Sequence, residues 1–198
     1  MKVIKFEEYS AHNSLAKSEL VELMRSNGYL QWEAETFDHY YVNYPYESNS
    51  FLLVTDDNDI AGHLGFIQVN LSNKGVKSCW CLHALVDAKY RNLSNFIKLV
   101  KCSEEKLKLD SYQLIVAMPN SAAADIYQKC LKWDNIGYIN FSLSHKIPKG
   151  GIANNRPLFF KKDDKYWKWR LNIDSSPSLV SQIYRWKDLD IRQILYMN

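Results

Sequence analysis

The sequence is poor in the residues that mark several common classes of protein. Its 198 residues include only 7 glycines, and they form no glycine-rich loop of the P-loop or Rossmann kind, which excludes those nucleotide-binding classes. The 4 cysteines are too few and too irregularly spaced for a disulfide scaffold, which favours a reducing cytoplasm. Apolar runs are far too short to span a bilayer, and the first residues turn acidic too early for a signal peptide. We therefore expect a soluble, cytoplasmic protein with no membrane partner.

A strong charge and an evident metal site are also missing. Lys and Arg total 25 against 22 Asp and Glu, and the resulting net charge of +3 is too small to predict nucleic-acid binding. Cys79 and Cys81 have no second cysteine pair and no histidine at ligand spacing, so no metal site is expected. The sequence contains no Gly-x-Ser-x-Gly elbow, which argues against a serine hydrolase.

Aromatic residues, by contrast, are abundant, at 14% of the chain. Seven of them crowd into a short segment: Tyr29, Trp32, Phe37, Tyr40, Tyr41, Tyr44 and Tyr46. Residues 29–49 show no clean period and contain Pro45, which predicts a long loop with a helical turn at most. Because tyrosine and tryptophan combine an apolar body with a polar tip, we expect this loop to line a pocket.

The order of the predicted elements indicates a mixed β-sheet with helices on its faces, an α/β or α+β fold. Strands and helices are expected, in chain order, as a strand over 3–6, a helix ending near Gly28, strands over 51–55, 60–69 and 78–86, a helix over 92–108, a strand over 112–118, a helix over 120–130 and a strand over 133–143.

The chain changes character after these elements. Lys149, Gly150 and Gly151 lie in a linker-like stretch, so we predict one domain over 1–145 and an appendage over 146–198. The appendage carries apolar side chains that should not be left in water: Tyr166, Trp167, Trp169 and Leu171. We expect it to dock on the domain or on a second subunit, which would make a homodimer.

The junction over 86–96, between a predicted strand and a helix, is the first candidate site. Backbone amides at the start of a helix bind phosphate readily, and Arg91 adds a countercharge. The same residues also fit an ordinary capped helix. The pattern resembles motif A of the GNAT superfamily of acyl-CoA-dependent N-acyltransferases: Val86, Tyr90 and Arg91 match it, and Asn92 and Ser94 stand where the family has glycines.

The next strand-to-helix junction is the second candidate site. Asn120, Ala123 and Tyr127 match the pattern Asn–x–x–Ala–x–x–x–Tyr of GNAT motif B residue for residue, and Tyr127 also fits a plain core position. The two motifs occur in the family's order, one strand apart, and the resemblance extends over residues 1–143. It implies the GNAT fold, a central sheet splayed between its fourth and fifth strands with helices on both faces.

The resemblance implies acetyl-CoA or another acyl-CoA as co-substrate, with its pantetheine between the splayed strands. The residues implied in binding it are Leu85, Val86, Arg91, Asn92, Leu93, Ser94, Asn95, Phe96 and Asn120. The amine is expected to attack the thioester directly. Tyr127 would protonate the leaving thiolate, and His83, or a carboxylate such as Glu33, Glu35 or Asp38 acting through water, would take the proton of the amine. The alternative is that His83 has no catalytic role and is a packed or hydrogen-bonded residue of the strand.

The aromatic loop is assigned to the acceptor side of the pocket through Trp32, Tyr44 and Tyr46. The stretches 43–46 and 164–170 resemble GNAT proteins of bacterial surface-polysaccharide clusters, which implies an amino sugar, for example a nucleotide-linked one, as the acceptor amine. A catalytically inactive GNAT-like module that binds a ligand or a partner is the alternative. This alternative is favoured by the replacement of the motif A glycines and by the shortness of the appendage.

Overall fold

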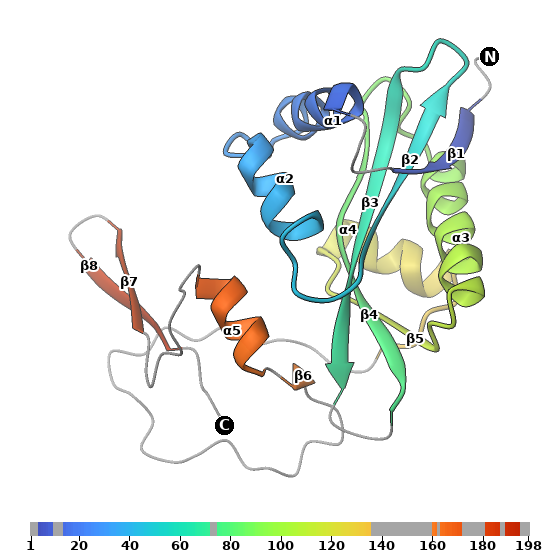
Figure 1. The fold of residues 1–198 in the computed structure, drawn as a ribbon. Helices are drawn as coiled ribbons and strands as arrows, with labels where there is room; N and C mark the ends of the chain where they lie inside the picture. The colour runs from blue at the N-terminus through green and yellow to red at the C-terminus, as the bar shows by residue number, and fades with distance from the viewer. Residues whose placement is uncertain are drawn as a thin grey trace.

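The computed structural model describes residues 4–9, 14–71, 75–135, 160–161, 163–171, 181–186 and 189–194. Its elements are, in chain order, β1 (Ile4–Glu8), α1 (Ser14–Ser26), α2 (Ala34–Tyr41), β2 (Ser48–Thr55), β3 (Ile60–Leu71), β4 (Lys77–Val86), α3 (Leu93–Leu109), β5 (Leu114–Ala117), α4 (Ser121–Asp125), the π-helix η1 (Ile126–Cys130), β6 (Phe160–Lys161), α5 (Asp164–Leu171), β7 (Ser181–Trp186) and β8 (Leu189–Ile194). Figure 1 shows their arrangement.

The central sheet follows the order of the chain, β1-β2-β3-β4-β5. Neighbours from β1 to β4 are antiparallel, and β4 pairs with β5 in parallel. A parallel pair needs a long crossover connection, and α3 supplies it. The predicted mixed sheet with helices is confirmed.

The helices cover opposite faces of this sheet (Figure 1). On one face, Leu20 and Met24 of α1 and Phe37 of α2 pack against Leu52 and Leu85. The other face is covered by α3 and the α4–η1 segment, and its buried residues include Phe51, Leu53, Leu64, Phe66, Cys79, Cys81, Leu99, Val100, Leu107 and Tyr127. We call these the α1–α2 face and the α3–α4 face.

A β-bulge interrupts β4 where it pairs with β3. His63 faces Leu85 and Gly65 faces Leu82, so His83 and Ala84 together oppose one residue of β3. His83 adopts the left-handed backbone conformation, with a φ of 55°. Histidine is uncommon there, and such strain is retained where the surrounding structure imposes it.

Close to the bulge, β4 and β5 separate. Their parallel pairing covers residues 78–81 of β4 and all of β5. β4 then continues to Val86, whereas the chain leaves β5 at Met118 and turns into α4. Along this edge, residues 82–86 of β4 have no strand partner among the described residues. We call this gap the fork; it is the predicted splay between the fourth and fifth strands.

The prediction of a loop over 29–49 was wrong for residues 34–41, which form α2. Phe37, Tyr40, Tyr41 and Tyr44 are spaced as on a helix, but the density of aromatic residues around them obscured the period. Phe37 and Tyr41 are buried against the sheet, and burial of this face is what stabilises so short a helix. Pro45 follows the end of α2 and does not interrupt it.

The helix predicted over 120–130 is present but changes type. Asn120 caps α4, since its Oδ1 accepts the Ala123 N–H at 2.9 Å. From Ile126 the chain winds as a π-helix, and the Leu131 N–H donates to the Ile126 carbonyl at 3.0 Å. The strand predicted over 133–143 is absent from 133–135, which are irregular, and the rest lies outside the described residues.

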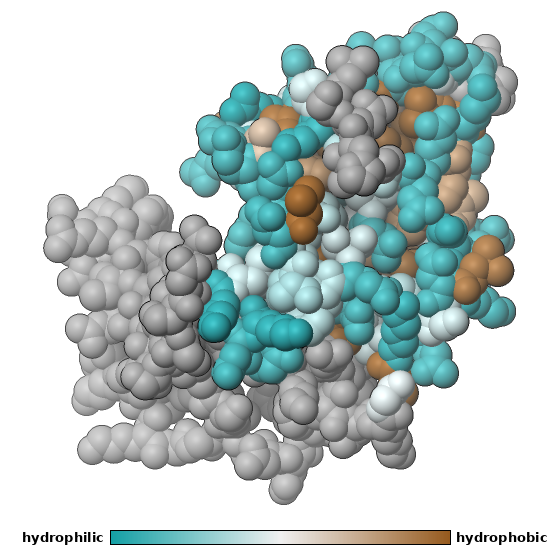
Figure 2. Space-filling model, viewed as in Figure 1, coloured by the Kyte–Doolittle hydropathy of each residue, from teal (hydrophilic) through white to brown (hydrophobic). Residues whose placement is uncertain are grey.

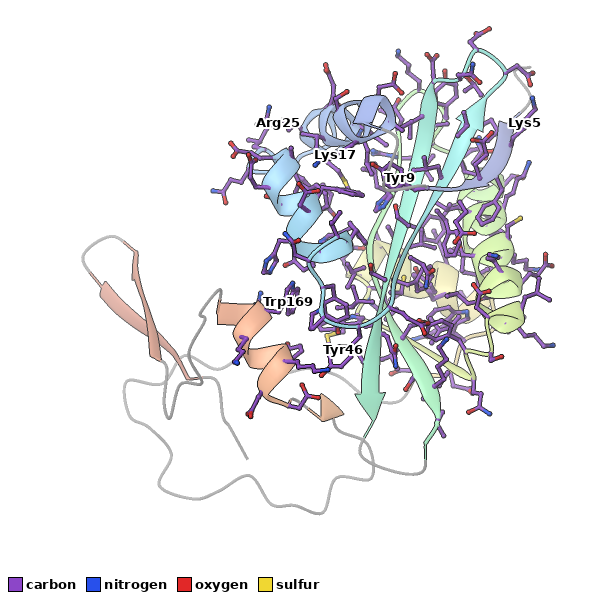
Figure 3. All side chains as sticks on the ribbon, viewed as in Figure 1. Lys5, Tyr9, Lys17, Arg25, Tyr46 and Trp169 are labelled. Atoms are coloured by element: carbon purple, nitrogen blue, oxygen red, sulfur yellow. The ribbon has the colours of Figure 1, made fainter. Side chains whose placement is uncertain are left out.

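Residues 160–161 and 163–171 of the appendage dock on the domain, whereas β7 and β8 pair with each other in a separate two-stranded sheet. β6 pairs with the end of β3, and the Tyr46 hydroxyl donates to the Asp163 carboxylate. Trp169 of α5 donates from its indole N–H to the His39 carbonyl at 2.6 Å and stacks on the His39 ring, with centroids 4.6 Å apart. Figure 3 shows Trp169 and Tyr46 between α5 and the domain. The side chains of Trp167 and Leu171, and the predicted boundary at 145/146, lie outside the described residues.

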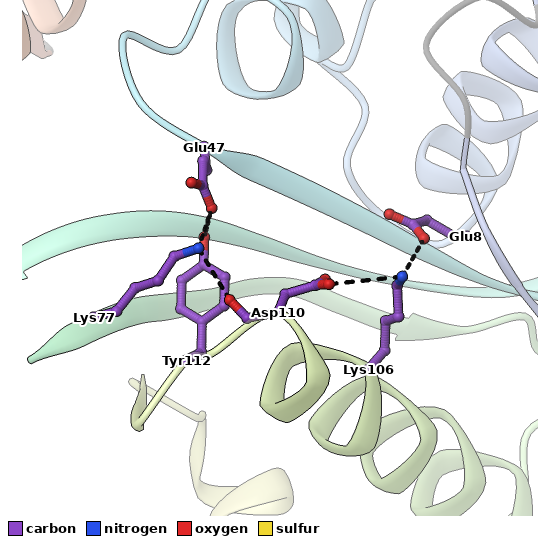
Figure 4. Close-up of polar contacts among 6 residues, drawn as sticks. All are labelled: Glu8, Glu47, Lys77, Lys106, Asp110 and Tyr112. Atoms are coloured by element: carbon purple, nitrogen blue, oxygen red, sulfur yellow. Dashed lines mark hydrogen bonds and ion pairs between the residues drawn. The ribbon is translucent and has the colours of Figure 1, made fainter.

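A polar cluster ties the end of the sheet away from the fork. Lys77 binds the Glu47 carboxylate at 2.6 Å, and the same carboxylate accepts the Tyr112 hydroxyl at 3.0 Å. Lys106 of α3 pairs with Glu8 of β1 at 3.3 Å (Figure 4). These contacts fasten the carboxyl end of α3 and the start of β5 to the strands beside them.

The visible described surface is mainly hydrophilic, with isolated hydrophobic groups (Figure 2). Large apolar side chains with high exposure, such as Leu30 and Leu109, are scattered rather than gathered. Within the described residues, no helix has both the length and the apolar character needed to cross a membrane.

Candidate active site

The turn between β4 and α3 is held by its own side chains. Asn92 caps α3, since its Oδ1 accepts the Asn95 N–H at 2.8 Å, and both asparagine amides donate to the Tyr90 carbonyl. Asn92 has a φ of −151°, an extended conformation that needs no glycine. The amides of Leu93 and Ser94 have no acceptor in the described part of the chain. These two N–H groups, at the positive end of a 17-residue helix, suit a phosphate.

Arg91 is engaged by protein groups rather than free for phosphate. Its Nε donates to the Val86 carbonyl at 3.2 Å and its Nη2 to Asn27 Oδ1 at 2.7 Å. Asn27 also donates to the Asp87 carboxylate at 3.4 Å. Arg91 thus ties the end of α1 to this turn. Lys89 beside it is exposed, and its ammonium has no partner among the residues described here.

Leu85 and Val86, which are predicted to bind the cofactor, are the last two residues of β4 and lie along the fork. Leu85 packs on the α1–α2 face and Val86 on the α3–α4 face, so only their main-chain groups line the gap. Phe96, at the start of α3, points away from the turn and packs edge-on against Tyr127, with ring centroids 5.7 Å apart.

Tyr127 is buried in η1, between Phe96 and Trp133. Its hydroxyl lies 3.6 Å from Cys81 Sγ, and Cys81 is the last β4 residue paired with β5. The hydroxyl is therefore at the vertex of the fork. Burial and the neighbouring Cys81 hold the pKa of Tyr127 far above its usual value, so the phenol keeps its proton at neutral pH.

His83 lies on the opposite face of β4, in the bulge. Its Nδ1 is 2.8 Å from the Tyr41 hydroxyl, and the rings of Trp32 and Tyr40 meet its ring edge-on at 4.8 Å and 4.9 Å between centroids. Burial lowers the pKa of the His83 imidazole to about 4, so the ring is neutral at pH 7. It is nevertheless partly exposed.

A second buried histidine supports the bulge. His63 of β3 is fully buried; its Nδ1 is 3.1 Å from the His83 carbonyl oxygen and its Nε2 is 2.8 Å from Ser50 Oγ. Because a carbonyl only accepts, Nδ1 carries the proton and Nε2 accepts the Ser50 hydroxyl. Burial and the nearby His83 lower the pKa of His63 to about 3.

The predicted catalytic residues are thus not in contact. Tyr127 approaches the fork from the α3–α4 face and His83 from the α1–α2 face, and both belong to or touch the stretch of β4 where pairing with β5 ends. A group that lay in the fork would have Tyr127 on one side and His83 on the other.

The predicted acceptor residues separate into two places. Trp32 is buried beside His83, as expected of a pocket wall. Tyr44 and Tyr46 instead pack with Trp169, and their hydroxyls are occupied by the Gln68 carbonyl and the Asp163 carboxylate. Their contacts hold the appendage.

The candidate carboxylates differ in availability. Asp38 forms an ion pair with Lys17 at 2.6 Å, and Glu33 lies 3.5 Å from Arg25. Glu35, in the first turn of α2, is exposed and has no partner among the described residues.

A cavity lies apart from the fork, where α3 ends and β5 begins. It has a volume of about 460 Å³ and is lined by Glu104, Lys108 and Tyr112 among others. Within the described residues, no group of three or more His, Cys, Asp or Glu side chains is arranged to hold a metal ion.

Sequence reasoning missed Tyr41, His63, Ser50 and Gly65. Tyr41 was assigned to a loop, although its helical spacing from Phe37 was visible. Gly65 has a specific role: a Cβ there would lie 1.8 Å from the Tyr41 hydroxyl oxygen, so only glycine leaves room for that hydroxyl. No sequence pattern identifies such a close approach between distant segments.

No protein-family model and no curated protein sequence matches the chain. Solved structures do match. A Trypanosoma brucei acetyltransferase superposes with a TM-score of 0.55 and 12% identity, covering 71% of this chain and 100% of that one. Glucosamine-6-phosphate N-acetyltransferase from Arabidopsis thaliana gives 0.52 and 15%, covering 73% and 99%. Ribosomal-protein-alanine N-acetyltransferase from Brucella melitensis biovar Abortus 2308 gives 0.56 and 13%, covering 72% and 99%.

These similarities concern the fold, because all three sequences have diverged far from this one. The chain has the architecture of these acetyltransferases, which is the fold that the two motifs predicted.

Proposed function

We propose that this chain is an acyl-CoA-dependent N-acyltransferase that moves an acetyl or other short acyl group to a primary amine, with an amino sugar as the acceptor. The observation that carries the proposal is the fork. One edge of β4 is left without a strand partner in the described structure, a helix start with unpaired amides follows it, and the Tyr127 hydroxyl lies at its vertex.

The fork suits the parts of an acyl-CoA in order. A pantetheine, which carries two amides, can pair with the main chain of Leu85 and Val86 as an added strand would. The amides of Leu93 and Ser94 and the ammonium of Lys89 would receive the pyrophosphate. The thioester would then lie near the vertex, beside Tyr127. The free cysteines fit the reducing, cytoplasmic location in which such a protein is expected.

In the proposed reaction the neutral amine attacks the thioester carbon, a C–N bond forms and the C–S bond breaks. Main-chain N–H groups of β4 near Leu85 polarise the carbonyl oxygen. The leaving thiolate takes the proton of the Tyr127 hydroxyl, which Tyr127 then regains from water. The proton lost by the amine passes to water, with Glu35 as an exposed acceptor. Holding the two substrates together supplies much of the acceleration.

The amino-sugar acceptor is supported by the surroundings of His83. Aromatic rings of Trp32, Tyr40 and the more exposed Tyr29 gather there, and such rings bind the apolar faces of sugars. One of the structures with this fold is a glucosamine-6-phosphate N-acetyltransferase.

The first test is binding and turnover of acetyl-CoA. Calorimetry should detect coenzyme A binding, and acetyl-CoA should be consumed in the presence of a nucleotide-linked amino sugar rather than a polyamine or a peptide amine. A protein with no measurable affinity for coenzyme A would instead be an inactive binding module.

The second test is Tyr127→Phe, which removes one oxygen and keeps the ring packing. The value of kcat should fall about 10²-fold, the lower end for a general acid because a thiolate leaves easily, while the free energy of unfolding changes little. Tyr112→Phe is the matched control, since its hydroxyl bonds Glu47 away from the fork and its loss should leave kcat unchanged. If Tyr127→Phe keeps the wild-type kcat at saturating acyl-CoA, Tyr127 is only a core residue and not a general acid.

A further inference from the structure

The hydrogen bonds around the bulge of β4 form one connected set. It consists of Ser50, His63, the main-chain carbonyl of His83, the His83 ring and Tyr41. Ser50, His63 and Tyr41 are buried, so each hydrogen atom in the set needs a partner within it.

The protons of this set can be assigned from the acceptors. The His63 N–H must point to the carbonyl of His83, and the Ser50 hydroxyl then donates to His63 Nε2. The Tyr41 hydroxyl has one acceptor within reach in the described structure, His83 Nδ1. A buried phenol without an acceptor would lose a hydrogen bond it makes in water, so Tyr41 donates to Nδ1.

With the protons assigned in this way, one hydrogen-bond donor has no acceptor. A neutral imidazole carries a single ring proton, and with Nδ1 accepting from Tyr41 that proton is on Nε2 of His83. No acceptor for Nε2–H exists among the described residues. The ring is partly exposed on the α1–α2 face, between Tyr29, Trp32 and Tyr40.

Three features keep this arrangement in place. Gly65 admits the Tyr41 hydroxyl, whose oxygen would be 1.8 Å from any Cβ at that position. The bulge turns His83 onto the same face as Leu82, and the His63 N–H holds the bulge carbonyl. Burial keeps both imidazoles neutral, because it lowers the pKa of each well below its usual value.

We propose that His83 meets the acceptor as a fixed hydrogen-bond donor through Nε2–H, with Tyr41 as the residue that positions it. The donor selects an acceptor molecule that carries an oxygen next to its amine, as a 2-amino sugar does and a polyamine does not. His83 then has no free nitrogen to take the amine's proton, which reverses the role that the sequence suggested. The identity of the bound oxygen rests on the proposed function; the proton assignment does not.

Nuclear magnetic resonance tests the proton assignment without any turnover. In protein labelled with ¹⁵N at histidine, a two-bond ¹H–¹⁵N correlation spectrum at pH 7 should show His83 with a bare Nδ1 and a protonated Nε2. In Tyr41→Phe the Nδ1 signal should move toward the value of an imidazole whose single proton exchanges between the two ring nitrogens. Tyr40→Phe, whose ring also touches His83 without a hydrogen bond to it, should leave both nitrogen shifts unchanged. A protonated Nδ1 in the wild type would overturn the proposal, whatever the variants do.

A titration tests the ligand. Glucosamine should shift the His83 Nε2–H signal, and cyclohexylamine, an amine on a similar ring without the oxygen, should not. Equal shifts, or none with either amine, would overturn the acceptor role. Failure of coenzyme A to bind would refute the proposed function and leave both of these readouts standing.

Kinetics provide the third readout. The ratio of kcat/KM for glucosamine over cyclohexylamine should fall about tenfold in His83→Gly, which suits the left-handed backbone of that position, and less in Tyr41→Phe. The pH profile of kcat/KM should follow the pKa of whichever amine is used. A break that stays in place when the amine is changed, and that disappears in His83→Gly, would show that His83 acts as a base.

Discussion

His63 is an imidazole without access to water, and its effect on stability depends on pH. Burial lowers its pKa to about 3 in the folded protein, whereas an unfolded chain binds the proton near pH 6.5. Between these values the unfolded state holds more protons, so the free energy of unfolding rises with pH. The contribution is complete above about pH 6.5 and is lost as the pH falls toward 3.

Replacing His63 by Gln removes this dependence and keeps a donor and an acceptor in place. Between pH 4 and 6 the slope of the unfolding free energy against pH should decrease by about 1.4 kcal/mol per pH unit. Urea denaturation at a series of pH values measures it. Above pH 7 the difference between the two proteins should be constant, which serves as the internal control. Parallel curves from pH 4 to 6 would show that His63 is protonated in the folded state.

At the scale of single elements, the start of α3 combines two tasks in one residue. Asn92 caps the helix, and in doing so its side chain uses the Asn95 amide that a phosphate would otherwise reach. Asn92→Ala should lower the free energy of unfolding by about 1 kcal/mol, and Asn92→Gly by only a few tenths.

The two substitutions should differ in acyl-CoA binding as well. Asn92→Gly frees the Asn95 amide and removes the Cβ, so the Kd for coenzyme A should fall severalfold, as measured by calorimetry on the folded variant. Asn92→Ala frees the amide but keeps a Cβ, and its Kd should fall less. A weaker binding in Asn92→Gly than in the wild type would mean that the asparagine side chain itself contacts the phosphates.

The elements that the sequence predicted well are those with a local signal. The strands from β2 to β4 and the helix α3 have clear periods and turn residues, and Asn120 is recognisable as a cap. The bulge at His83 and the π-helical turn at Tyr127 have no such signal, because each depends on contacts with distant segments. The same holds for the site, in which Tyr41 reaches His83 from a helix 42 residues earlier in the chain.

At the scale of the whole molecule, the indole of Trp169 links α5 of the appendage to the aromatic residues of α2. Trp169 contacts His39, Tyr40 and Tyr44, and Tyr40 in turn touches His83. The appendage therefore reaches the candidate acceptor site through a single aromatic residue. The homodimer stays a prediction.

Trp169→Ala should detach α5. Hydrogen exchange read by mass spectrometry should show faster exchange over 164–171 and unchanged protection in the sheet, because the core clusters of the two faces do not include α5. Trp169→Phe keeps the stacking and loses the indole donor, so it should give an intermediate result. Lys168→Ala, at an exposed position of the same helix, is the control. Protection over 164–171 that survives Trp169→Ala would show that other contacts hold the helix.

The bulge in β4 makes the candidate site sensitive to the length of the chain. Before the bulge, odd-numbered residues such as Cys79 and Cys81 face α3; after it, even-numbered residues such as Ala84 and Val86 do. Because the bulge is one extra residue, deletion of His83 would leave a regular alternation in which Ala84 and Val86 still face α3. Deletion of two residues would instead exchange the faces of every later side chain of the strand. Removal of a single residue is thus a change by which a descendant of this protein would lose the candidate site while keeping its core.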